Sequence, residues 1–223
     1  MSTLANMWPY LTDGFTLTLV LFIGSAVLST VVGTLLAAMR VSPVAPFRGF
    51  GSGYVNIFRN TPLVVMFILV VEGLPAIGVQ PNVSALGLNV FETLAVLTLS
   101  IYTSSFVCEA VRSGINTVDP GQAEAGRAVG MNFGQSLRLI VLPQAFRAAI
   151  PPLASTYIAL VKNTSVAAAF GVTEATYQLS RMIEATVASA IVAFFGIAAG
   201  YIVIVWVVAG LFSLMERQGA TAR

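Results

Sequence analysis

The sequence predicts an all-α membrane protein with about five transmembrane helices and a polar two-helix insert on the cytoplasmic side. Hydrophobic residues make up 57% of its 223 residues and charged residues only 9%, whereas about 25% of the residues in soluble domains are charged. The mean hydropathy is +0.89. Residues 14–39 and 185–215 form uncharged runs of 26 and 31 residues, and about 20 apolar residues are enough to cross a bilayer.

Five hydrophobic segments are long enough to serve as membrane-spanning helices. The first is uncharged throughout, and the fifth lies within the second long uncharged run. The fourth has the weakest pattern, because Pro151 and Pro152 disturb its start and Lys162 lies within it. In chain order, the expected spans cover about 14–39, 54–74, 92–112, 150–170 and 189–214. Together with an insert at 119–143, they make residues 1–223 one transmembrane domain.

The insert begins with a short helix that has explicit start and stop signals. Asp119 is a good N-cap, Pro120 suits the first helical position, and Gln122 lies where a capping-box partner belongs. Gly130 is placed to end this helix in a left-handed conformation. The helix consists mainly of small residues, which let another backbone approach closely: Ala123, Ala125, Gly126 and Ala128. We therefore expect a docking element at this position.

A second short helix is expected to follow, because Asn132 and Gln135 repeat the start signal. Leu142 and Pro143 come at the end of its apolar pattern. The apolar residues that fall on one face of this helix are Phe133, Leu137, Ile140 and Val141. The two helices together form a polar hairpin between the third and the fourth span.

The basic residues indicate how the chain is oriented in the membrane. With five spans, nine of the eleven basic residues fall on one side, and only Lys162 and Arg181 fall on the other. Cytoplasmic loops carry an excess of Lys and Arg, so we expect the insert and the C-terminus in the cytoplasm and the N-terminus outside. The nine residues on the expected inner side are Arg40, Arg48, Arg59, Arg112, Arg127, Arg138, Arg147, Arg217 and Arg223.

A polar cluster interrupts the fourth span, where Lys162 is followed by Asn163, Thr164 and Ser165. Ionisable residues inside membrane spans often mark substrate pathways, so this cluster is a candidate site at which a cation and hydroxyl groups face an anionic or zwitterionic ligand. The alternative is that Lys162 extends to the outer headgroups while its neighbours cap a helix break. The sequence leaves both interpretations open.

The third span contains two further sets of polar residues. Glu109 and Arg112 lie three residues apart on one helical face near its inner end. An ion pair that neutralises both groups, or a contact with the insert, is the expected role. Thr103 and Ser104 lie deeper in the span, where hydroxyl groups either line a path or bond to the backbone and to neighbouring helices.

Several classes of function are disfavoured by motifs that the chain lacks. Without histidine there is no imidazole metal site and no histidine-based catalysis, and no metal site is expected. No Gly-x-x-x-x-Gly-Lys-Ser/Thr motif is present to bind ATP phosphates, and no membrane-enzyme signature is found. A secondary transporter would usually have inverted repeats and about twice as many spans. A purely structural membrane scaffold leaves the capped hairpin unexplained.

The insert also carries a family resemblance. Glu124-Ala125-Gly126, Gly130, Ile140 and Leu142-Pro143 stand in the spacing of the EAA signature, which is typical of permease subunits of binding-protein-dependent ABC importers. Gly126 occupies a slot in which alanine is commoner. Residues 112–118 are similar to the permease subunits of glutamate uptake systems. The other segments that resemble the polar amino acid branch of this family are 59–63, 102–104 with Glu109, and 162–165.

This resemblance, which covers about residues 10–215, implies the fold of a type I importer transmembrane domain and a transport role without enzymatic activity. The implied partners are a second permease subunit, identical or paralogous, two ATPase subunits that bind ATP and Mg, and an extracytoplasmic solute-binding protein. The implied substrate is a polar amino acid, glutamate or a related one, carried across a bacterial cytoplasmic membrane. The residues implied in coupling to the ATPases are Glu124, Ala125, Gly126, Gly130, Leu142 and Pro143.

Overall fold

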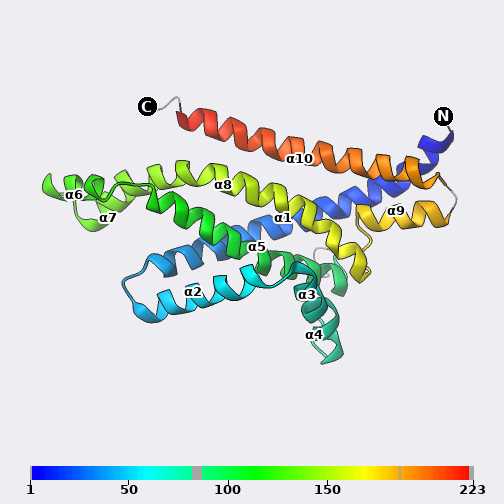
Figure 1. The fold of residues 1–223 in the computed structure, drawn as a ribbon, viewed down its shortest axis with the longest axis horizontal. Helices are drawn as coiled ribbons and strands as arrows, with labels where there is room; N and C mark the ends of the chain where they lie inside the picture. Colours follow the sequence, from blue (N-terminus) through cyan, green and yellow to red (C-terminus); the bar gives the residue numbers. More distant parts are fainter. Residues whose placement is uncertain (1, 82–86, 186, 221–223) are drawn as a thin grey trace.

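The computed structural model describes residues 2–81, 87–185 and 187–220. All regular structure in these residues is helical, which confirms the predicted all-α fold. Figure 1 shows long helices that run side by side, with α6 (Pro120–Ala128) and α7 (Phe133–Ser136) at one end and α9 (Ala175–Glu184) at the other. The long helices are α1 (Ser2–Val41), α2 (Ala45–Asn60), α5 (Val90–Asn116), α8 (Leu142–Asn163) and α10 (Ala190–Ala220).

The central helix is α5, which packs against α1, α2 and α8. In its most apolar window 67% of the residues are buried, compared with 28% in α1 and 17% in α10. Leu21, Leu99 and Leu160, from α1, α5 and α8, are fully buried in the main hydrophobic cluster. The outer faces of α1 and α10 are therefore left exposed, as expected for helices that contact lipid or another subunit.

Glycines set the spacing of the three central helices. A Cβ atom on Gly33 in α1 would lie 2.6 Å from the Cβ of Val107 and 2.8 Å from the carbonyl oxygen of Ser104, both in α5. A Cβ atom on Gly114 in α5 would overlap the carbonyl oxygen of Ala145 in α8. Small residues at such crossings allow the helix backbones to pack closely within a membrane.

The second span differs from the prediction of one helix over about 54–74. The helix α2 begins at Ala45 and ends at Asn60, and the chain bends by 106° before the next helical segment. Pro62 causes the break, because the residue before a proline is disfavoured in the helical conformation. Thr61 is accordingly extended, with ψ 128°. Beyond the bend follow α3 (Leu63–Phe67), a π-helical turn (Ile68–Glu72) and α4 (Gly73–Ala76).

The fourth predicted span, about 150–170, also has different limits. The helix α8 begins at Leu142, so Pro151 and Pro152 lie inside it and do not mark its start. After Asn163 the helix tightens into a 3-10 segment (Thr164–Phe170), which ends at Gly171 with a φ of +77°. The helix α9 then follows, and the sequence analysis did not predict it.

By length and composition, three helices qualify as membrane spans, and the bent pair of α2 with α3–α4 makes a fourth when it is counted as one crossing. The three are residues 5–41 of α1, all of α5, and residues 190–218 of α10. The 22-residue α8 does not meet the same criterion, since it contains Arg147, three prolines and Lys162. Of the five predicted spans, three therefore correspond to single helices and one to the bent pair, whereas the predicted span at about 150–170 does not qualify by length and composition.

We predict that replacing Gly33 with alanine destabilises the protein, because a methyl group would push α1 away from Val107. Overpacking of this kind typically costs about 1–3 kcal/mol. The change should lower the midpoint of thermal unfolding of the purified protein in detergent. The matched control is Gly49→Ala in α2, where an added Cβ meets no atom within 4 Å. Equal midpoints for the two variants would contradict the close approach of α1 and α5.

Candidate coupling insert and intramembrane polar residues

The predicted first helix of the insert is α6, and its ends agree with the predicted signals. The carboxylate of Asp119 accepts a hydrogen bond of 2.7 Å from the backbone N–H of Gly121, and Pro120 occupies the first turn. Gly130 adopts a φ of +90°, and its N–H donates to the carbonyl oxygen of Arg127 at 3.0 Å. The bond from Asp119 goes to Gly121, so Gln122 does not supply the side chain of a capping box here.

The small residues of α6 divide between two faces. Gly126 is buried, and a Cβ atom there would lie 2.7 Å from the Cδ1 of Ile140 and 3.3 Å from the Oγ of Ser136. Gly126 therefore serves the packing of α6 against the following helical turn. Glu124 and Ala125 are exposed and point away from this contact. The outward face is the part of α6 that remains available to a partner.

The second predicted helix begins as expected but does not end within the insert. Asn132 and Gln135 form a complete capping box, with both side chain to backbone bonds at 2.9 Å. The short α7 passes through a π-helical turn (Leu137–Val141) directly into α8. Pro143 explains this turn, because a proline lacks an N–H and its ring crowds the carbonyl group four residues earlier. Leu142 and Pro143 thus belong to the start of α8.

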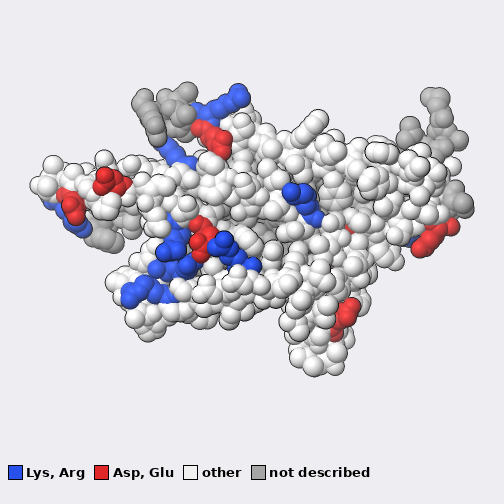
Figure 2. Space-filling view, viewed as in Figure 1, with Lys and Arg blue, Asp and Glu red and all other residues white. Residues whose placement is uncertain are grey.

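The surface of the insert is unusually apolar for a region outside the core. Val129 is 77% exposed and Leu139 is 62% exposed, and Leu142 and Phe146 are exposed nearby. Figure 2 shows that charged side chains on this face gather towards the end of the molecule that carries α6, α7 and the turn between α1 and α2. Exposed apolar side chains next to charged groups are typical of a surface that contacts another protein.

The predicted pair of Glu109 and Arg112 is present, but a third residue makes the closer contact. The Nη1 of Arg112 lies 4.0 Å from the Oε2 of Glu109. Arg40, at the C-terminal end of α1, bonds to the Oε1 of Glu109 and lies 3.9 Å from the Sγ of Cys108. Its side chain is only 11% exposed. The carboxylate of Glu109 therefore joins α5 to α1, a contact that sequence spacing within one helix cannot reveal.

Lys162 is exposed and lies at a groove of about 270 Å³ between α8, α9 and α10. The polar residues that line this groove with it are Ser165, Thr176 and Tyr201, and the opposite wall is apolar. Ser165 donates to the carbonyl oxygen of Lys162 at 2.6 Å. The groove thus combines a cation with hydroxyl groups, which fits an anionic group of a ligand or lipid.

The other candidate path residues lie deeper in the helix bundle. Thr164 is fully buried and donates to the carbonyl oxygen of Val161 at 2.7 Å, while Asn163 is half-buried. The hydroxyl of Ser104 lies 2.9 Å from that of Tyr54, so it joins α5 to α2. Thr103 is buried, and its hydroxyl has no hydrogen-bond partner among the described residues. These residues are not part of the groove at Lys162.

A buried carboxylate at the opposite end from the insert joins three helices. Glu174 precedes α9 and is fully buried. Its Oε1 accepts bonds from the backbone N–H groups of Thr176 at 2.7 Å and Tyr177 at 3.1 Å. Its Oε2 accepts bonds from the hydroxyls of Tyr201 in α10 at 2.5 Å and Thr18 in α1 at 3.2 Å. Four donors thus surround the carboxylate.

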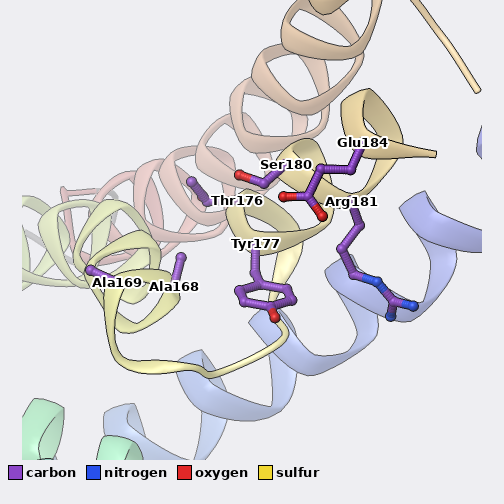
Figure 3. A pocket seen from close by; sticks show the side chains of 7 residues that line it. All are labelled: Ala168, Ala169, Thr176, Tyr177, Ser180, Arg181 and Glu184. Atoms are coloured by element: carbon purple, nitrogen blue, oxygen red, sulfur yellow. The ribbon is translucent and has the colours of Figure 1, made fainter. Parts of the chain in front are cut away.

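A larger pocket lies beside this carboxylate, at the outward side of α9. It has a volume of about 440 Å³ and is shown in Figure 3. The Cζ atom of Arg181 lies 6.0 Å from the centre of the Tyr10 ring in α1, the direction in which the side chain extends in the figure. The residues that line the pocket are Ala168, Ala169, Thr176, Tyr177, Ser180, Arg181 and Glu184. The described residues form no cluster of three or more acidic or thiol groups that could hold a metal ion.

Residues 29–218 match the family described as the binding-protein-dependent transport system inner membrane component. The chain belongs to this family of permeases. The resemblance inferred from the EAA-like spacing of Glu124 to Pro143 is thereby confirmed. The family match begins within α1 and ends near the end of α10, so it includes the insert and both irregular spans.

The permease has relatives that match almost all of its length. The glutamate transport system permease protein GluC of Corynebacterium efficiens is 42% identical, with 98% of each chain covered. The glutamate/aspartate import permease protein GltK of Escherichia coli O6:H1 is 36% identical over 74% of each chain. A crystal structure of an amino acid ABC transporter with histidines has a chain that is 30% identical, with a TM-score of 0.83 and 96% of each chain covered. The MetNI methionine ABC transporter shares the fold, with a TM-score of 0.76 at 21% identity.

The sequence names Glu174 as a possible counter-charge of Lys162, but no ion pair joins them among the described residues, and Glu174 caps α9 instead. This capping role and the pairing of Arg40 with Glu109 were missed by the sequence analysis, and each had a weak signal. Glu174 precedes Ala175 and Thr176 at the start of α9, and a carboxylate at that position suits a helix N-cap. Arg40 ends the first uncharged run, but its pairing with Glu109 depends on how α1 and α5 cross. The helix start was recognisable in the sequence, whereas the pairing between helices was not.

Proposed function

We propose that this permease is the transmembrane subunit of an ATP-driven importer of polar amino acids, with glutamate or a related amino acid as the substrate. It would act in a bacterial cytoplasmic membrane with a second permease subunit, identical or paralogous, two ATPase subunits and an extracytoplasmic solute-binding protein. ATP and Mg bind to the ATPases, and this chain carries out no catalysis. The identity of 42% to the glutamate permease of Corynebacterium efficiens, over nearly the whole of both chains, supports this substrate class.

The observation that carries the proposal is the exposed, capped insert of a chain that has the permease fold. The helix α6 is capped by Asp119 at its start and ends at the left-handed Gly130, and its residues Glu124 and Ala125 are exposed. A secondary transporter or a structural scaffold has no need of such an element. An ATPase partner needs a rigid protrusion that it can bind.

The connections of the insert explain how a movement there would reach the membrane. The helix α5 ends only a few residues before α6, and α7 continues through a π-helical turn into α8. The inner halves of α5 and α8 are in close contact at Gly114 and Ala145. When ATP closes the ATPase dimer, a displacement of α6 would therefore shift α5 and α8 together and change access to a central path.

We further propose that the groove at Lys162 contacts the substrate on its way through the membrane. A glutamate-type substrate has two carboxylates, and Lys162 is a fixed cation beside Ser165, Thr176 and Tyr201. An unpaired cation inside a membrane costs at least about 2.5 kcal/mol on insertion scales, so a counter-charge is expected. No described acidic residue lies within ion-pair distance of Lys162. A substrate carboxylate would fill that role.

The proposed orientation places the insert and the C-terminus in the cytoplasm and the N-terminus outside. Most of the nine basic residues on the expected inner side, Arg40 and Arg48 among them, lie at the end of the bundle that carries the insert. Arg59 is an exception, because it lies within α2 one turn beyond Tyr54, whose hydroxyl bonds to the middle of α5. The charge asymmetry remains large without it.

Replacing Gly130 with leucine should uncouple ATP hydrolysis from uptake. The cost comes from the backbone, because Gly130 has a φ of +90° and no atom within 4 Å of an added Cβ. A left-handed conformation costs an L-residue roughly 1–2 kcal/mol, so the end of α6 should rearrange. Uptake of glutamate per ATP hydrolysed, measured in proteoliposomes with the partner subunits, should fall. Gly134→Ala is the control, since its Cβ meets only Asn132 at 3.5 Å. Normal coupling in the leucine variant would refute the docking role of α6.

Single cysteines should report the proposed orientation in whole cells. In a Cys108→Ala background, Gln80→Cys is expected to react with an impermeant thiol reagent, because Gln80 is exposed beyond the outer end of α4. Ala125→Cys, on the outward face of α6, should react only after the membrane is permeabilised. Labelling at position 125 but not at position 80 in intact cells would contradict the proposed topology.

Lys162→Gln should reduce glutamate uptake by the assembled complex, because the amide retains hydrogen bonding but lacks the positive charge. A charged hydrogen bond contributes about 1.5–3 kcal/mol, so we expect a loss of about tenfold or more. Uptake is measured with the same binding protein and ATPases as for the wild type. An unchanged rate and affinity in a normally assembled complex would leave Lys162 as an interfacial residue.

A further inference from the structure

Arg59 lies at an unexpected depth for an exposed charged residue. The hydroxyl of Tyr54, five residues earlier in α2, lies 3.0 Å from the carbonyl oxygen of Ile101 and 2.9 Å from the Oγ of Ser104. These two residues are at the middle of α5, which runs from Val90 to Asn116. The chain enters α2 beside the inner end of α1, where Gly51 packs on Arg40. Arg59 therefore lies beyond the midpoint of α5, well inside the membrane.

The side chain of Arg59 has no partner within its own subunit. The residue is exposed, and no described residue forms a hydrogen bond or an ion pair with its guanidinium group. Asn56 and Asn60, on the same side of α2, are also exposed. Around them the exposed surface is apolar: Phe50, Ile57, Val64, Val65 and Ile68. A small polar patch of Asn56, Arg59 and Asn60 thus interrupts an otherwise lipid-like surface.

Lipid is an unfavourable environment for this patch. An arginine remains charged under all physiological conditions, and charged residues at mid-membrane depth almost always face a bundle interior or a water-filled cavity. The chain also breaks directly after Asn60, where it turns by 106° at Thr61 and Pro62. Irregular backbone at membrane depth is tolerated only where protein or an aqueous cavity covers it. Both features indicate that the patch faces a polar path.

The carboxylates of the subunit itself do not supply a counter-ion at this depth. Two acidic residues are held within the helix bundle, and both are engaged. Glu109 pairs with Arg40 and Arg112, and Glu174 accepts four hydrogen bonds. An identical second permease would bring the same engaged residues. Glu72, which lies beyond the bend, is exposed and forms no ion pair with Arg59. A ligand that moves through the path is therefore a favourable source of negative charge for Arg59.

We propose that Arg59 binds a carboxylate of the amino acid substrate at the centre of the permease, an inference that rests on the proposed transport of polar amino acids. The planar guanidinium group can donate two parallel hydrogen bonds to a carboxylate. The amide of Asn56, which lies one turn earlier on the same side of α2, offers an acceptor for the substrate's ammonium group. The break at Thr61 and Pro62 keeps the following apolar residues clear of this position.

The test compares Arg59→Gln and Arg59→Lys with the wild type in the complete importer. Radiolabelled L-glutamate is the probe, and it is measured both as ATP-dependent uptake into proteoliposomes and as direct binding to the permease–ATPase complex without the binding protein. For Arg59→Gln we expect both signals to fall about tenfold or more, since a charged hydrogen-bond partner is lost. Arg59→Lys should bind with intermediate affinity, because the charge remains but the two parallel hydrogen bonds do not.

The control is Arg48→Gln, which removes the same charge from the start of α2. Among the described residues, Arg48 bonds only to the carbonyl oxygens of Ser42 and Pro43, and its replacement should leave uptake and binding unchanged. Wild-type binding and uptake in both Arg59 variants would overturn the proposal. Loss of the second permease subunit from both variants would also overturn it, because Arg59 would then be a subunit contact. If only Arg59→Gln fails to assemble, glutamate binding by Arg59→Lys is the test. Reduced affinity would support the proposal, and wild-type affinity would overturn it.

These outcomes are separate from those that test the proposed function. A wild-type complex that does not accumulate glutamate at the expense of ATP would refute the proposed function itself. A wild-type complex that does accumulate glutamate, together with unaffected Arg59 variants, would refute only the role of Arg59.

Discussion

The hydrocarbon interior of a bilayer does not solvate charges or free hydrogen-bonding groups, and the arrangement of this permease follows from that constraint. Glu109 is enclosed by Arg40 and Arg112, and Glu174 accepts bonds from four donors. Each carboxylate therefore has at least one partner on another helix: Arg40 of α1 for Glu109, and Thr18 of α1 and Tyr201 of α10 for Glu174. The same groups that would be costly when unpaired therefore hold the helices in register.

The two paired carboxylates lie towards opposite ends of the bundle. Glu109 joins the C-terminal ends of α1 and α5, near the insert, whereas Glu174 joins α1 and α10 to the start of α9. Gly33 allows a close backbone contact of α1 with α5, and Gly114 allows one of α5 with α8 on the insert side of Glu109. The insert, α5 and α8 thus form one continuous, tightly packed unit, and α1 connects it to the other end of the molecule. Such a unit suits a protein that must transmit a movement from one side of a membrane to the other.

The unsatisfied groups are as informative as the satisfied ones. Arg59 and Lys162 remain exposed without an acidic partner among the described residues, and apolar side chains of the insert remain uncovered. A ligand carboxylate would be favourable next to Arg59 and Lys162, and we propose that the uncovered apolar side chains of the insert contact another protein. The bend at Pro62 ends α2 directly after Arg59 and Asn60, so the exposed guanidinium group lies next to a break in the helix.

The sequence by itself determined the all-α class, the starts of the two insert helices and the family, because these depend on composition and on signals within a few residues. The capping box of Asn132 with Gln135 and the left-handed Gly130 illustrate such local signals. The breaks at Pro62 and Pro143 have local causes, but the tertiary structure alone decided the 106° angle after Asn60, the merging of α7 with α8 and the depth of Arg59. It also decided the pairing of Arg40 with Glu109, residues that are 69 positions apart. Such contacts depend on how helices cross, and the crossing is set by packing over the whole bundle.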